Sequence, residues 1–96
     1  MGHYGTISPE KFNLFQNYPN PFNPTTGIEY SIPVFSHVSL KVYNGLGQVV
    51  AVLFEDHQQA GRYVTKFDAS RLQSGVYVCR LESGNTYFAK KLILLK

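Results

Sequence analysis

The chain has 96 residues, of which 44% are hydrophobic and 16% are charged, and its formal net charge is +3. This length fits one domain with a modest core, and the composition excludes a disordered tail. No apolar run approaches the roughly 20 residues of a membrane-spanning helix, and the scattered cations argue against nucleic-acid binding.

Residues 1–11 contain no basic segment followed by an apolar run, so they do not form a secretory signal peptide. We interpret this segment as a cloning scar or a linker, with His3 as a cloning remnant. If the domain is exported, we expect the signal peptide upstream, in a longer parent protein.

Residues 12–26 read FNLFQNYPNPFNPTT and form a lead-in rich in proline and asparagine. Proline lacks a backbone N–H and disfavours helical geometry in the residue before it, so this lead-in cannot be a helix or a central strand. We expect an ordered, turn-rich edge. Its apolar side chains should pack onto the domain, namely those of Leu14, Phe15, Tyr18 and Phe22.

Residues 27–96 predict a series of short strands separated by turn residues. Pro33 should end the first strand. Residues 49–54 are almost continuously apolar, which indicates a strand covered on both faces or a strand with a bulge. The other expected strands lie at 28–32, 38–43, 62–67, 75–81 and 87–95, with turns or loops at 44–47, 55–61, 68–72 and 83–85. This spacing predicts an all-β fold, an immunoglobulin-like antiparallel β-sandwich of about seven short strands.

The sequence offers little support for catalysis or for a bound metal or cofactor. The residue types of a hydrolase triad occur without a nucleophile elbow, at Asp56, His57, Asp68 and Ser70. We place His37 and His57 in polar turns without a second ligand at metal spacing. No helix follows Gly45-Leu46-Gly47, which we interpret as a hairpin turn and not a phosphate site. We therefore predict no catalytic, metal-binding or cofactor-binding residues.

The single cysteine, Cys79, excludes an internal disulfide. Tyr77 and Leu81 flank it at two-residue spacing, so we expect Cys79 to be a small core side chain. Two interpretations of the strand tyrosines Tyr43, Tyr63 and Tyr87 stay open: a platform that stacks on sugars, or cross-strand packing partners.

At this point the residues resemble a known family, the type A C-terminal sorting domain of the type IX secretion system. The matching segments are LFQNYPNPFNPTTGIEYSIP at 14–33, VSLKVYNGLGQVV at 38–50, AGRYVTKFDASRLQSGVYVCRL at 60–81 and KKLILLK at 90–96. The family's sorting motifs fall on Pro19, Asn20 and Pro21, on Gly75 and Tyr77, and on a terminal strand bounded by lysines, with Lys91, Leu92, Leu94 and Lys96.

The resemblance implies that residues 12–96 are a non-catalytic sorting module that directs a larger secreted protein across the outer membrane to the cell surface. The implied partners are an outer-membrane translocon, a surface transpeptidase and an upstream cargo domain, reached after transit through the periplasm. The sequence also resembles the immunoglobulin-like domain of the flagellar hook-capping protein. The alternative functions are a carbohydrate-binding or structural appendage of a secreted enzyme.

The terminal segment contains both expected core residues and expected sorting residues. Leu92 and Leu94 share one face of the strand, whereas Ile93 and Leu95 share the other, so we expect the strand to be largely covered on both sides. We expect Lys91 and Lys96 to be exposed charges, whose replacement by Gln changes stability by less than about 0.5 kcal/mol. An edge strand could also pair with a second molecule, which leaves the oligomeric state open.

Overall fold

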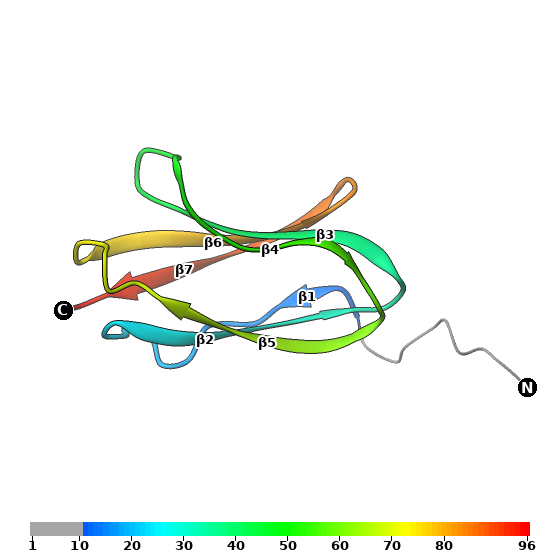
Figure 1. Ribbon diagram of the computed structural model, residues 1–96, viewed down its shortest axis with the longest axis horizontal. Helices are drawn as coiled ribbons and strands as arrows, with labels where there is room; N and C mark the ends of the chain where they lie inside the picture. The colour runs from blue at the N-terminus through cyan, green and yellow to red at the C-terminus, as the bar shows by residue number, and fades with distance from the viewer. Residues whose placement is uncertain (1–10) are drawn as a thin grey trace, which may run out of the picture.

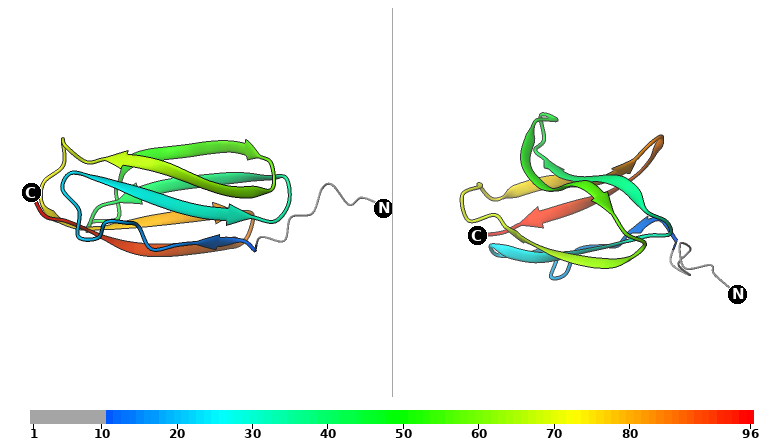
Figure 2. Two further views of the ribbon diagram at one scale, coloured as in Figure 1. Left: turned by 90° about the horizontal axis from the view of Figure 1, so that it is seen from below. Right: turned by 45° about the vertical axis from the view of Figure 1, so that its right-hand side comes forward.

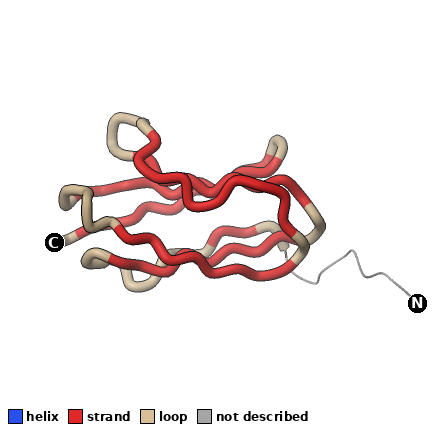
Figure 3. The backbone as a smooth tube through the Cα atoms, viewed as in Figure 1, coloured by secondary structure: helices blue, strands red, loops and turns tan. Residues whose placement is uncertain are grey.

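A computed structural model describes residues 11–96, which form seven strands in two sheets packed face to face (Figure 1). The expected linker at 1–11 lies, except for Lys11, outside the described residues. Figure 3 shows that strands and loops make up this whole part of the chain. The strands are β1 (Asn13–Leu14), β2 (Thr25–Ile32), β3 (Ser36–Tyr43), β4 (Val49–Gln58), β5 (Gly61–Asp68), β6 (Gly75–Ser83) and β7 (Thr86–Leu94).

The smaller sheet has the order β1-β2-β5 and the larger sheet the order β4-β3-β6-β7, with antiparallel pairing between neighbouring strands. The prediction of an antiparallel β-sandwich of about seven strands is confirmed. The fourth strand joins the larger sheet because a tight hairpin pairs it with β3. In constant-type immunoglobulin domains the fourth strand instead lies with the first, second and fifth.

The core lies between the sheets and follows the two-residue alternation of the strands. The expected inward faces of 28–32, 38–42 and 77–81 are buried, and Pro33 directly follows the end of β2. Each buried aliphatic or aromatic side chain contributes about 1.5–3 kcal/mol relative to an exposed one. The main core side chains are Leu14, Phe22, Ile28, Tyr30, Ile32, Val38, Leu40, Val42, Phe67, Tyr77, Cys79, Leu81, Leu92 and Leu94.

Two expectations for the fourth strand are corrected. The predicted polar loop at 55–61 is wrong, because β4 pairs with β3 as far as Gln58 and only two residues separate it from β5. The strand is not covered on both faces, since Val49 and Val52 are 48% and 55% exposed. The bulge alternative holds: the register with β3 shifts twice. Polar residues remain in strand geometry here because β4 is a sheet edge, where one side of the strand is wet.

The lead-in packs against the sandwich as expected, with one exception. Leu14 and Phe22 are buried, and Phe15 is half-buried beneath the guanidinium of Arg62, 4.6 Å from the ring centroid. Tyr18, however, is 84% exposed. Its backbone N–H and C=O both pair with Gly27, at 3.0 and 2.9 Å. The backbone therefore anchors Tyr18 while its side chain points to solvent.

The lead-in also differs from expectation at its two ends. It begins with the two-residue strand β1, and its last residues, Thr25 and Thr26, already belong to β2. The Ser31 hydroxyl donates to the carbonyl of Lys11, which ties the beginning of the described chain to β2. The peptide bonds before Pro19, Pro21 and Pro24 are cis.

We expect the Cys79 thiol to be unreactive in the folded protein. The side chain is 0% exposed, and burial raises the pKa of the thiol to about 12. At pH 8 a disulfide reagent should label the protein only after guanidinium unfolds it, because the thiolate is the nucleophile. The raised pKa also makes the free energy of unfolding depend on pH. The contribution of the protonated thiol is fully present below the unfolded-state pKa near 9, and it is lost as the pH rises towards 12, because the unfolded chain releases the proton first.

The C79A variant is the control for both effects. It should not react in either state, and it should lose less stability between pH 9 and pH 11 than the unsubstituted chain. Labelling of the native protein at the rate of an exposed thiol would contradict the burial of Cys79.

Candidate functional site

The residues of the expected sorting motifs gather at one end of the sandwich. We call this the motif end and define it as residues 16–24, 69–77 and 91–96. It contains the lead-in loop, the connection between β5 and β6, and the end of β7. Figure 1 shows the C-terminus at this end and the beginning of the described chain at the opposite end. Motifs distant in sequence thus share one region.

The lead-in runs along the outer edge of β7, as the left view of Figure 2 shows. Gln16 Nε2 donates to the Lys91 carbonyl at 2.8 Å, and the Ile93 N–H donates to Asn20 Oδ1 at 2.9 Å. Phe22 then forms a parallel bridge, donating its N–H to Ile93 O at 2.9 Å and accepting from Leu95 N at 3.0 Å. These bonds occupy the edge of β7 from Lys91 to Leu95, which is closed to further strand pairing.

Asn20 is the member of the Pro19-Asn20-Pro21 motif whose side chain contacts the terminal strand. The Pro19 carbonyl accepts from Thr26 Oγ1 at 2.7 Å and from Asn17 Nδ2 at 3.1 Å. Asn17 is only 3% exposed and also donates to Thr26 Oγ1 at 3.0 Å. The two prolines restrict the loop, and the buried Asn17–Thr26 pair holds its backbone in place.

Sequence reasoning missed Asn17 and Thr26. The only available signal was the preference of asparagine for turns, and this segment contains four asparagines. Which of them is buried depends on the approach of β2, so the pattern of the lead-in alone could not distinguish Asn17 from Asn23.

The Gly75 and Tyr77 motif opens β6 beside the terminal strand. Gly75 is the register partner of Leu94, and Tyr77 is the partner of Leu92. The Tyr77 ring is buried, and its hydroxyl donates to the Gln73 carbonyl at 2.7 Å. Tyr77 therefore fastens the β5–β6 connection to the core, which is a positioning role.

Both motif lysines are exposed, as expected, but they differ in their hydrogen bonds. Lys96 Nζ donates to the carbonyls of Ser70 and Leu72, both at 2.7 Å, and the Lys96 N–H donates to Ser74 Oγ at 2.9 Å. The ammonium therefore fastens the β5–β6 connection. Lys91 is exposed, and its side chain makes no hydrogen bond or ion pair within residues 11–96. We therefore expect only the replacement of Lys91 to leave stability nearly unchanged.

The terminal strand is covered on one face, so the expectation of two covered faces is only partly right. Leu92 and Leu94 are 1% and 0% exposed and belong to the core. Ile93 is half-buried, while Leu95 is 57% exposed. Among residues 11–96, no second layer covers the outer face of the larger sheet, and Leu95 and Lys91 are open to solvent.

The turn after β5 forms as the sequence indicates. Asp68 Oδ1 accepts the Ser70 N–H at 2.9 Å, and this hydrogen bond lowers the pKa of the Asp68 carboxyl. The four candidate triad residues do not converge: Asp56 and His57 lie near the end of β4, whereas Asp68 is the last residue of β5 and Ser70 follows it, at the far end of that strand. Their arrangement gives no basis for a hydrolase.

The placement of His37 and His57 in polar turns is wrong. Both lie in strands and are register partners, with ring centroids 5.1 Å apart, because β4 extends further than expected. The Phe35 ring stacks on His57 at 5.4 Å. Within residues 11–96, no three His, Cys, Asp or Glu side chains gather as a metal site would require.

The comparison with family models decides the identity of the chain. Residues 16–95 match the secretion system C-terminal sorting domain, the tail of type IX secretion cargo. The chain belongs to this family. Comparisons with curated proteins and with solved structures give no match.

The sorting domain is thus a non-catalytic module that acts as a C-terminal signal for type IX secretion. Membership implies interaction with that secretion system and export to the cell surface or the extracellular space. Within residues 11–96, no helix is long and apolar enough to cross a membrane.

We expect N20A to destabilise the sorting domain by about 1 kcal/mol, because the Ile93 N–H loses its acceptor in a partly buried setting. Urea unfolding followed by tyrosine fluorescence measures the change. N23A is the matched control: Asn23 is exposed in the same loop, and its side chain makes no hydrogen bond among the described residues. Equal stability of the two variants would contradict a stabilising role for the hydrogen bond between Asn20 and Ile93.

K96Q should lower stability more than K91Q. The first substitution removes an ammonium that donates to two carbonyls, whereas the second removes a solvated charge. We expect a loss of about 1 kcal/mol for K96Q and less than about 0.5 kcal/mol for K91Q. Thermal unfolding measures both, and a K91Q loss as large as that of K96Q would exclude this distinction.

Proposed function

We propose that residues 12–96 are the transferable sorting unit of a larger exported protein and that the translocon reads the motif end. The residues proposed for recognition are Pro19, Asn20, Pro21, Gly75, Tyr77, Lys91, Leu92, Leu94 and Lys96. One observation carries the proposal: segments separated by up to about 75 residues in sequence meet through direct hydrogen bonds at this end. A folded surface, and not a linear peptide, is then what the receptor contacts.

The positions of the two chain ends favour this arrangement. The beginning of the described chain lies at the opposite end of the sandwich from the C-terminus (Figure 1). An upstream cargo domain would extend away from the motif end, so even a bulky cargo would leave the motif end accessible to the translocon. We propose that the parent protein carries an upstream signal peptide, crosses the periplasm and meets an outer-membrane translocon and a surface transpeptidase.

Within the motif end, we assign different roles to the residues. Tyr77, Leu92 and Leu94 are buried and shape the surface from below. Asn20 and Lys96 hold neighbouring segments through hydrogen bonds. Pro21 and Lys91 are exposed, and they are our candidates for direct contact with the receptor.

We expect residues 12–96, fused behind a periplasmic reporter, to send the reporter outside a host that has type IX secretion. K91Q should reduce export without lowering the melting temperature, because the Lys91 ammonium has no partner within residues 11–96. Reporter activity in medium and periplasm, with the melting temperature of each purified fusion, is the measurement.

K66Q is the matched control, since Lys66 is an exposed strand lysine on the other sheet and outside the motif end. A folded fusion that stays periplasmic would overturn the sorting unit as bounded here. If the K91Q fusion is exported as well as the K66Q fusion, Lys91 does not take part in recognition, and the other motif residues remain to be tested.

A further inference from the structure

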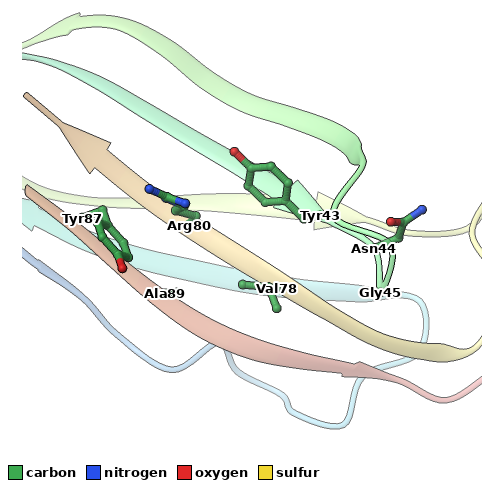
Figure 4. A pocket seen from close by; sticks show the side chains of 8 residues that line it. Tyr43, Asn44, Gly45, Val78, Arg80, Tyr87 and Ala89 are labelled. Carbon is green, nitrogen blue, oxygen red and sulfur yellow. The ribbon is translucent and has the colours of Figure 1, made fainter.

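A groove of about 420 Å³ lies on the outer face of the larger sheet (Figure 4). Tyr43, Val78, Arg80, Tyr87 and Ala89 line it, together with the β3–β4 hairpin. We call it the tyrosine groove, and none of these five residues belongs to the proposed sorting motifs. We propose that the tyrosine groove binds a saccharide chain, a function separate from sorting.

The shape of this face suits an extended ligand. The β3–β4 hairpin and the β6–β7 hairpin both bend away from the smaller sheet, so the outer face is concave between them (Figures 1 and 3). The floor consists of the small side chains of Val78 and Ala89. The volume lies within the range of about 300–1,000 Å³ that is usual for small-ligand sites.

Two aromatic side chains with free hydroxyl groups border the tyrosine groove. Neither Tyr43 nor Tyr87 makes a hydrogen bond through its hydroxyl within residues 11–96, and Tyr87 is 57% exposed. The strand register puts their Cα atoms about 16 Å apart, two strands across and four residues along the sheet. Two or more sugar rings are needed to reach both.

The third strand tyrosine is not part of this surface. Tyr63 belongs to the smaller sheet, stacks on Tyr30 at 5.6 Å and donates its hydroxyl to the Gln59 carbonyl at 2.7 Å. The structure therefore separates the two open interpretations of the tyrosines: Tyr63 is a cross-strand packing partner, whereas Tyr43 and Tyr87 remain available to a ligand.

Arg80 lies between the two tyrosines and supplies hydrogen-bond donors. Its guanidinium is 4.0 Å from the Tyr87 ring centroid. One nitrogen pairs with Glu82 at 3.3 Å, and Nε is covered without a hydrogen-bond acceptor. The donor capacity of Arg80 is therefore only partly used by the protein. A guanidinium beside a carboxylate offers donors and acceptors together, which matches neighbouring sugar hydroxyls.

Lys91 adds a cation beside the groove residue Val78. It is the register partner of Val78 and is on the same face, and its ammonium has no partner in the described chain. The ammonium offers three N–H donors and no acceptor, so it favours a ligand rich in oxygen.

The polar groups at the centre of the tyrosine groove favour a saccharide over other ligands. A sugar ring has an apolar C–H face for aromatic stacking and a polar rim for Arg80. A purely apolar partner would cover Arg80 without supplying an acceptor, which is unfavourable. A peptide in strand form would add to a sheet edge, but the lead-in occupies part of the β7 edge and β4 carries two register shifts.

The test is an amide NMR titration of the isotope-labelled 96-residue chain with cellotetraose, chitotetraose and tetragalacturonate. These probes are neutral, N-acetylated and acidic. We expect at least one to give saturable shifts at residues 43–47, 78–80 and 87–89. Y87A and R80Q should each weaken that binding about tenfold, by removing a stacking face or a charged donor.

Y18A is the matched control, because Tyr18 is an exposed tyrosine on the lead-in, and it should bind as the unsubstituted chain does. Unchanged melting temperatures show that Y87A and R80Q fold. The proposal is overturned by an absence of shifts with all three probes, by shifts mapped to another surface, or by binding that Y87A and R80Q leave intact. The titration does not involve export, so its result is independent of the sorting proposal.

Discussion

The hydrogen bonds between the lead-in and the outer edge of β7 are the constraint on which the motif end depends. Phe22 places its ring in the core and its backbone against Ile93, so one residue joins the packing between the sheets to the pairing along an edge. Without these hydrogen bonds, β7, which carries two buried leucines, would be an unpaired edge of its sheet. Such an edge favours pairing with other molecules.

The hydrogen bonds between the lead-in and β7 explain why motifs at both ends of the sequence form one structural unit. The lead-in holds β7 on its outer edge, while β6 holds it on the inner edge through the Gly75–Leu94 and Tyr77–Leu92 pairs. Lys96 then fixes the β5–β6 connection from the last position. The shape of the proposed recognition surface is therefore coupled to the stability of the fold, and only residues such as Lys91 can separate recognition from folding.

The sandwich keeps its surfaces distinct. The inner faces form the core, the motif end collects the sorting motifs, and the outer face of the larger sheet carries the tyrosine groove. Lys91 belongs to the motif end and lies on β7 opposite Val78, which lines the groove. A ligand in the groove and a receptor at the motif end would thus lie close enough to affect each other through this side chain.

The sequence by itself determined the all-β class, the inward faces of the main strands, the core position of Cys79 and the family. These follow from two-residue alternation and from motifs at characteristic spacing, which are local properties of the chain. Tertiary structure decided the extent of β4, because pairing with β3 holds polar residues 55–58 in a strand. It also decided that His37 faces His57, that Tyr18 points to solvent and that, within residues 11–96, the Lys96 ammonium is hydrogen-bonded while that of Lys91 is not. Each of these depends on which segments meet across the sheets, and no local pattern specifies that meeting.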